Sequence, residues 1–202
     1  GLKRISLTDH DSLDGFAEAL EESNKLGIDL MPGVEITTID YHMLGYNFDV
    51  TDDNFRSFVK YSQSLQAEVC KARVDKLQDY GVPINFEDVE NNFPKSTLGK
   101  IAILRTMLSD ENCTQYFKEQ HGDVDVKQIF NLYLGRSSVV HHVKTSNFIS
   151  WEESANEIHH VLNASDAFVL VQQLRSWIEL LLFLSQHDNL RSKLHLQKIR
   201  CG

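Results

Sequence analysis

The feature that most constrains this fold is a strand–helix–strand pattern within the first 36 residues. Leu2 to Leu7 alternates in polarity and predicts a strand. A helix follows, because residues 13, 16, 17 and 20 are apolar and share one helical face, and Gly27 is placed to end it. Ile28 to Met31 predicts a second strand. Strands joined by one crossover helix form a βαβ unit, so these two strands should be parallel.

The segment that follows predicts one more strand near the same place. Pro32-Gly33 suggests a turn into Val34–Ile36, and His42 to Tyr46 predicts a third short strand. Asp11 or Ser12 is placed to cap the N-terminus of the first helix. The predicted fold class is therefore α/β.

Polar residues that could carry chemistry follow the ends of these strands. In parallel α/β sheets, functional side chains collect on loops that leave the carboxyl ends of strands. His10 follows the first strand, Glu35 ends the second and His42 starts the third. Two imidazoles and a carboxylate are suitable ligands for zinc, manganese or iron. Asp9 is placed to orient one imidazole by accepting a hydrogen bond from it, without binding the metal itself.

Each of these residues also has an ordinary structural interpretation. Thr8-Asp9-His10-Asp11 is a common turn and helix-cap sequence. Glu35 is compatible with a solvated strand end, and His42 with a half-buried histidine whose hydrogen bonds are satisfied within the protein. Composition alone does not choose between these interpretations and a metal site.

The middle of the chain is helical in pattern. Apolar residues at helical spacing run from Phe55 to Tyr80, and further helices are predicted at 97–109, 112–120 and 125–134. A strand at Val139–Val143, a helix from Ser150 to Leu162 and a strand at 167–171 then resume the α/β pattern. We expect an α/β portion at 1–50 and 139–172, a helical insertion at 51–138 and an atypical tail at 173–202.

Composition limits the class of partner. The net charge of −9 predicts no basic face, which makes a nucleic-acid partner unlikely, although a bound cation would still admit a small anionic substrate. The three cysteines, Cys70, Cys113 and Cys201, show no metal or disulfide spacing and suggest free thiols in the cytoplasm. No apolar run is long enough for a membrane span.

Three motifs together resemble the PHP (polymerase and histidinol phosphatase) family. They are Thr8-Asp9-His10-Asp11, Gly33-Val34-Glu35-Ile36 and His42-Met43-Leu44-Gly45-Tyr46, and they look most like the bacterial branch that acts on nucleotide phosphates. The resemblance implies a distorted (β/α) barrel, present here in part, with a helical insertion. It also implies that His10, Glu35 and His42 are metal ligands, with Glu35 bridging metals.

The resemblance implies a metal-dependent phosphoesterase that hydrolyses small phosphate esters, such as nucleotide phosphates, with metal-activated water. The alternative is a non-catalytic binding or scaffolding protein derived from such a domain. A domain attached to a DNA polymerase, also found in this family, fits the helical insertion and the acidic balance less well.

The chain departs from the family pattern at both ends. The family's opening His-x-His motif would precede Gly1, Val171-Gln172-Gln173 stands where Ala-His-Pro is expected, and a late Asp-x-His motif is missing. We expect natural sequence before Gly1, and a reading-frame error near codon 171 rather than a divergent tail. With three ligands, we expect weak or single-metal binding and little hydrolysis by this chain.

Overall fold

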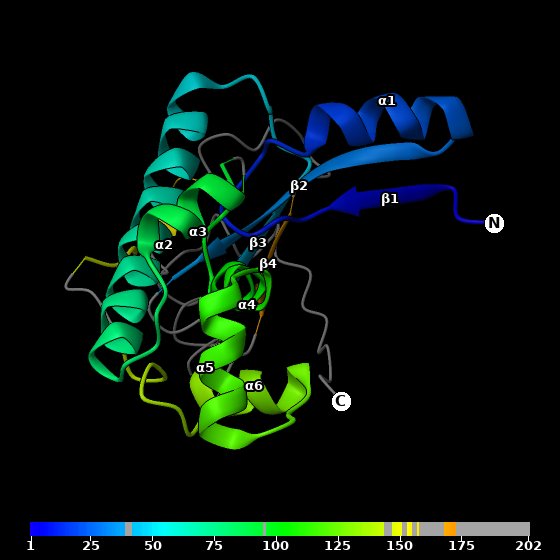
Figure 1. Cartoon of the computed structure of the whole chain (residues 1–202). Coiled ribbons are helices and arrows are strands. Elements are labelled where there is room, and N and C mark those ends of the chain that lie inside the picture. The colour runs from blue at the N-terminus through cyan, green and yellow to red at the C-terminus, as the bar shows by residue number, and fades with distance from the viewer. Residues whose placement is uncertain are drawn as a thin grey trace. The chain divides into compact units, whose positions relative to one another are not determined.

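The protein has a mixed α/β structure (Figure 1). The computed structural model describes residues 1–38, 42–94, 96–143, 147–150, 153–154, 157 and 168–172. Its strands are β1 (Arg4–Leu7), β2 (Asp29–Thr37), β3 (His42–Tyr46) and β4 (Phe168–Gln172). Its helices are α1 (Phe16–Leu26), α2 (Asp53–Asp79), α3 (Phe86–Asn92), α4 (Lys100–Ser109), α5 (Glu111–His121) and α6 (Val126–Tyr133).

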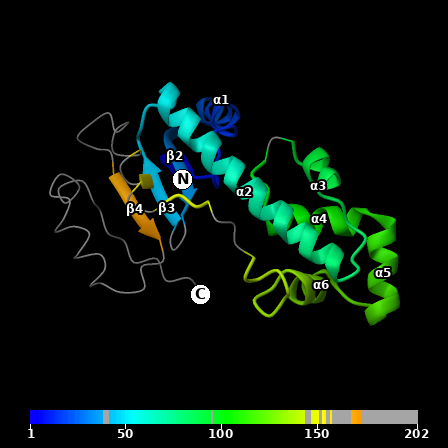
Figure 2. The ribbon, with the colours of Figure 1, turned by 90° about the vertical axis from the view of Figure 1, so that its left-hand side faces the viewer.

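The four strands form one sheet in the order β1-β2-β3-β4. β1 and β2 are parallel, as the βαβ pattern predicted, whereas β2–β3 and β3–β4 are antiparallel. Figure 2 shows β2, β3 and β4 side by side. The strand predicted at 167–171 is confirmed as β4.

The turn predicted at Pro32-Gly33 is wrong, because β2 runs through both residues. Residues 29–32 pair with β1, and residues 33–37 pair with β3. The strand therefore changes partner where the turn was expected. A Cβ on Gly33 would lie 2.2 Å from Ser6 Oγ and 2.8 Å from the Leu7 carbonyl oxygen. The glycine thus serves close strand approach rather than chain reversal.

The first predicted helix is confirmed, but its N-terminal cap is not. α1 ends at Gly27, whose φ of 65° is left-handed and whose N–H group donates to the Asn24 carbonyl. At the other end Gly15 occupies the cap position without a side-chain hydrogen bond. Asp11 does not cap α1, because its carboxylate accepts instead from the Thr37 backbone N–H group.

The chain divides into two compact units. One comprises Gly1–Ser62 with Phe148–Gly202, and the other is Gln63–Asn147. Helix α2 contributes residues to both. The predicted division at residues 50, 138 and 172 stays a prediction. The first unit has a buried core formed by β2, β3 and the start of α2, which includes Val34, Ile36, Met43, Phe48, Phe55 and Val59.

The second unit is built from helices around its own apolar core. The helices predicted near α4, α5 and α6 are confirmed, and α3 is an additional short helix. The buried residues include Cys70, Val74, Leu77, Ile103, Met107, Phe117, Leu134 and Val140. Cys70 and Cys113 are buried free thiols, and burial raises the pKa of each to about 12. Cys201 lies outside the described residues.

The strand predicted at Val139–Val143 is wrong. The segment forms successive turns, in which the His141 N–H group donates to Ser138 O and the Val143 N–H group donates to Val140 O. Val140 is fully buried in the helical core of the second unit. The apolar run is therefore explained by packing against helices rather than by a place in the sheet.

The predicted helix at 150–162 is described only at its start. The Glu153 N–H group donates to Ser150 Oγ at 3.1 Å, as the capping sequence predicted. Residue 157 is also helical, whereas residues 158–162 of this prediction and the tail after residue 172 lie outside the described residues. Among the described helices, none combines the length and the hydropathy that a membrane crossing requires.

Candidate metal centre

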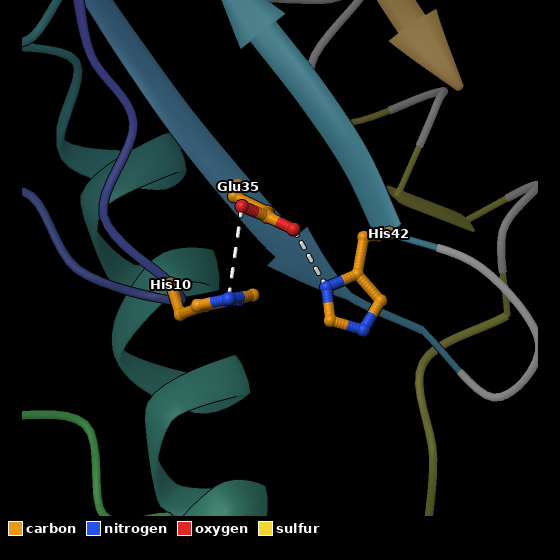
Figure 3. A group of neighbouring side chains, drawn as sticks. All are labelled: His10, Glu35 and His42. Carbon is orange, nitrogen blue, oxygen red and sulfur yellow. Dashed lines mark hydrogen bonds and ion pairs between the residues drawn. The ribbon is translucent and has the colours of Figure 1, made fainter. Parts of the chain in front are cut away.

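His10, Glu35 and His42 come together at one end of the sheet (Figure 3). His10 lies in the loop after β1, Glu35 lies in β2, and His42 is the first residue of β3. Each offers one nitrogen or oxygen atom, and these atoms all lie within 4.8 Å of one another. Figure 3 shows the Glu35 carboxylate on one side of both imidazoles, with a dashed line to each.

The two carboxylate oxygens face different histidines. Glu35 Oε1 lies 2.7 Å from His42 Nδ1, and Oε2 lies 3.7 Å from His10 Nε2. The two rings meet edge to face, with centroids 4.9 Å apart. One carboxylate is therefore placed to interact with both imidazoles at once.

Strand register explains why these side chains meet. His42 pairs with Thr37 in the antiparallel ladder, and Thr37 shares a face of β2 with Glu35 because alternate residues of a strand point the same way. His42 is therefore a diagonal neighbour of Glu35 on that face. His10 forms an isolated parallel bridge with Glu35 beyond the end of β1.

Glu35 is the most enclosed of the three groups. Its side chain is 14% exposed, against 33% for His42 and 52% for His10. A carboxylate removed from water requires charged or hydrogen-bonding partners, which the histidines provide. The charge of Glu35 also reaches Tyr46, whose pKa is raised by burial and, to a lesser extent, by repulsion from this carboxylate.

The arrangement fits a divalent transition metal. Zinc bonds to histidine nitrogen and carboxylate oxygen are about 2.0–2.2 Å long, so two ligands of one ion lie at most about 4.4 Å apart. The observed limit of 4.8 Å requires only a small inward rotation of a side chain. The nitrogen–oxygen–nitrogen donor set is shared by zinc, manganese and iron sites and does not select among them.

Asp9 contacts the site through its backbone. Its carbonyl oxygen accepts a hydrogen bond from the Glu35 N–H group at 3.0 Å. Its side chain approaches Gly15, where a Cβ would lie 2.9 Å from Asp9 Oδ2. The predicted role of Asp9 in orienting an imidazole stays a prediction.

Asp11 is the site neighbour that the sequence interpretation missed. It is fully buried, with a φ of 49°. Its N–H group donates to the Glu35 carbonyl at 2.8 Å. The one sequence signal is its residue type, since aspartate adopts left-handed backbone more readily than most residues.

The remaining described histidines have other surroundings. His121 Nε2 lies 2.8 Å from the Tyr133 hydroxyl, which accounts for its position. His141 and His142 contact each other in the second unit. Among the described residues, His10, Glu35 and His42 form the one group of three histidine, cysteine, aspartate or glutamate side chains spaced for a metal ion. His159 and His160 lie outside that part of the chain.

Comparison with known proteins finds similarity both in sequence and in structure. No protein-family model matches the sequence. A 5'-3' exoribonuclease of Haemophilus influenzae is 32% identical over 87 residues, which are 41% of this chain and 32% of that protein. The match therefore spans about a third of the relative's length.

Solved structures with a similar fold match nearly the whole chain. One is a protein from Bifidobacterium adolescentis described as a metal-dependent phosphoesterase, with a TM-score of 0.72 and 19% sequence identity. The match covers 97% of this chain and 76% of the Bifidobacterium protein. An amidohydrolase from Chromobacterium violaceum, solved with bound sulfate and no metal, has a TM-score of 0.63 at 18% identity. That match covers 96% of this chain and 65% of the amidohydrolase. The chain therefore shares its fold with these two structures, one of them the metal-dependent phosphoesterase, in agreement with the phosphoesterase fold that its motifs predicted.

Proposed function

We propose that this protein is a divalent-metal-dependent hydrolase that cleaves phosphate esters. The observation that carries the proposal is the Glu35 carboxylate interacting with both His10 and His42, in a fold similar to that of a metal-dependent phosphoesterase. We further propose that β1 to β4 form part of a distorted PHP-type barrel. The helical residues of the second unit are then the insertion.

The three side chains have distinct proposed roles. His10 and His42 supply neutral nitrogen ligands, and Glu35 supplies negative charge and two oxygens that can reach different ligand partners. A divalent ion bound there supplies Lewis acidity toward a phosphoryl oxygen and lowers the pKa of a bound water molecule. Glu35 is the least exposed of the three and lies near both histidines, which places it at the centre of the proposed site.

The proposed substrates are small phosphate esters such as nucleotide phosphates. A net charge of −9 disfavours extended contact with a nucleic-acid backbone, whereas one phosphate needs only a local positive charge. Hydrolysis at the end of an RNA strand is a second candidate, favoured by the similarity to the H. influenzae exoribonuclease. The two substrates differ at the reacting phosphorus, because a nucleoside monophosphate is a phosphomonoester whereas the RNA backbone linkage is a phosphodiester.

The test measures metal binding and hydrolysis on the same samples. The chain is loaded with Mn²⁺ or Zn²⁺ and its metal content is determined by elemental analysis. Release of phosphate from a nucleoside monophosphate is then compared with shortening of a 5′-phosphorylated RNA oligonucleotide. We expect bound metal, and slow, metal-dependent hydrolysis that favours the monophosphate. Preferential shortening of the RNA would support the second candidate instead.

A matched pair of variants separates the enzyme from a non-catalytic scaffold. Glu35→Gln keeps the shape of the side chain but removes its charge, and Glu68→Gln makes the same change at an exposed position of α2. Metal binding and hydrolysis should be lost in the first and retained in the second. Equal metal content and activity in both variants would overturn the proposal.

A further inference from the structure

A buried carboxylate lies directly beside the candidate metal centre. Asp11 follows His10 in the chain and is 0% exposed. One of its oxygens, Oδ1, accepts from the Thr37 N–H group at 2.8 Å and from the Ser62 hydroxyl. Asp11 thus contacts β2 and α2, and both contacts lie within the first unit.

The backbone of Asp11 is tied to the same strand. Its N–H group donates to Glu35 O, while Glu35 N donates to Asp9 O. His10 is therefore flanked on both sides by hydrogen bonds to Glu35. The Asp11 carboxylate adds a third attachment two residues further along β2, at Thr37.

Helix α2 provides a fixed support for this carboxylate. Ser62 is fully buried, and Phe55 and Phe58 on the same helix are buried as well. The packed helix prevents the Ser62 hydroxyl from following a displaced loop. Asp11 therefore connects the His10 loop to two elements whose positions are set by core packing.

Asp11 has a conformation that needs such support. A φ of 49° places a residue with a side chain in the left-handed region, which is less favourable than extended or helical backbone. Its Oδ2 atom is buried and has no hydrogen-bond partner among the described residues. The hydrogen bonds to Oδ1 are thus the described contacts that hold this carboxylate.

We propose that Asp11 is a positioning residue, whose bonds to Thr37 and Ser62 hold the His10 imidazole beside Glu35 and His42. Its role in metal binding rests on the proposed function, whereas its effect on the histidine geometry does not. Asp11 does not contact the metal position in this role. It acts through the loop that carries His10.

Ring contacts in the metal-free protein test the geometry. The His10 and His42 ring centroids are 4.9 Å apart, so nuclear Overhauser effects should connect their ring protons. These signals should persist in Asp14→Ala, which removes an exposed carboxylate from the same loop. They should disappear in Asp11→Ala, and Asp11→Asn should restore them because its amide oxygen can accept the same two bonds.

Metal affinity provides the second measurement. Asp11→Ala should weaken Mn²⁺ binding by about 10- to 100-fold, the range seen when groups behind metal ligands are removed. Ser62→Ala should produce a smaller loss in the same direction, with Ser57→Ala on the exposed face of α2 as its control. If Asp11→Ala does not fold, the role of Asp11 is tested with Ser62→Ala and Asp11→Asn. The measurements are again the contacts between the His10 and His42 rings and the affinity for Mn²⁺.

The outcomes separate this inference from the proposed function. An Asp11→Ala protein that loses thermal stability but keeps the ring contacts and the metal affinity would show a purely structural role and overturn the inference. If the unmodified protein shows the ring contacts but binds no metal, the proposed function fails. The ring contacts of the variants then still decide the role of Asp11.

Discussion

Two pairs of histidines in this protein have nearly the same ring geometry but different surroundings. The His10 and His42 rings meet edge to face with centroids 4.9 Å apart, and those of His141 and His142 do so at 4.7 Å. In the first pair, the Glu35 carboxylate interacts with both rings. Around His141 the charged neighbours are cationic, namely Lys100, Arg136 and Arg73.

The comparison indicates that two close imidazoles need a neighbouring negative charge to favour a cation. A cation is attracted where a carboxylate offsets its charge, and it is repelled by lysine and arginine. The two pairs also arise differently. His141 and His142 are neighbours in sequence, whereas strand pairing brings His10 and His42 together from positions 32 residues apart.

The largest expected effect is loss of the carboxylate that distinguishes the first pair. Glu35→Gln removes the negative charge beside the imidazoles and should weaken Mn²⁺ binding by more than the roughly 10- to 100-fold typical of supporting residues. Isothermal titration calorimetry would measure the affinity, with Glu68→Gln as the control. A loss of affinity of less than about threefold would fall below that range and would contradict a metal site at Glu35.

Removal of one imidazole from each pair tests the comparison directly. His42→Ala deletes a proposed ligand and should reduce metal affinity by about 100-fold, the upper end of the supporting-residue range. His142→Ala deletes a ring from the cationic cluster and should leave metal affinity unchanged. Metal titrations of both variants would measure this. A comparable loss in both would mean that the second pair also binds metal.

Substitutions at two glycines test the close approach of β1 to β2, the strands next to the His10 and His42 pair. Gly33→Ala forces a Cβ against Ser6 Oγ and the Leu7 carbonyl, and should lower the free energy of unfolding by about 1–3 kcal/mol. Gly99→Ala, in the second unit, meets no atom within 4 Å and should cost less. Urea denaturation would measure both changes. Equal losses in the free energy of unfolding would show that the close approach of β1 to β2 at Gly33 does not make this position more sensitive to a side chain.

The smallest expected effect is electrostatic and concerns the second pair. Desolvation, followed by repulsion from His142 and nearby cations, lowers the pKa of His141 below its ordinary value of 6.5. Arg136→Gln removes one of these cations and should raise the pKa of His141 toward its ordinary value. An NMR titration would measure it. An unchanged or lower pKa would argue against repulsion from Arg136.

The same shift has a defined effect on stability. The unfolded chain takes up the proton on His141 at a higher pH than the folded chain does, so acidification favours unfolding. This contribution is absent above about pH 6.5 and develops as the pH falls toward the lower folded-state pKa. Arg136→Gln should reduce the loss of stability over that interval.

The elements that depend on local pattern agree with the structure. Apolar periodicity predicted α1 and the helices near α4, α5 and α6, because a helical face is formed by residues close together in sequence. The predictions failed where a tertiary contact determined the conformation. Pro32-Gly33 is strand because β2 changes partner there, and Val139–Val143 forms turns because Val140 is buried among helices.

The sequence by itself determined the α/β class, the parallel β1–β2 pair and the three residues of the candidate centre. It did so because βαβ units have one favoured topology and because metal-capable side chains stand at predicted strand ends. Only the tertiary structure decided the antiparallel β3 register, the place of Glu35 beside two imidazoles and the attachment of Asp11 to Thr37 and Ser62. These features depend on pairing and burial between segments distant in sequence, which local patterns do not encode.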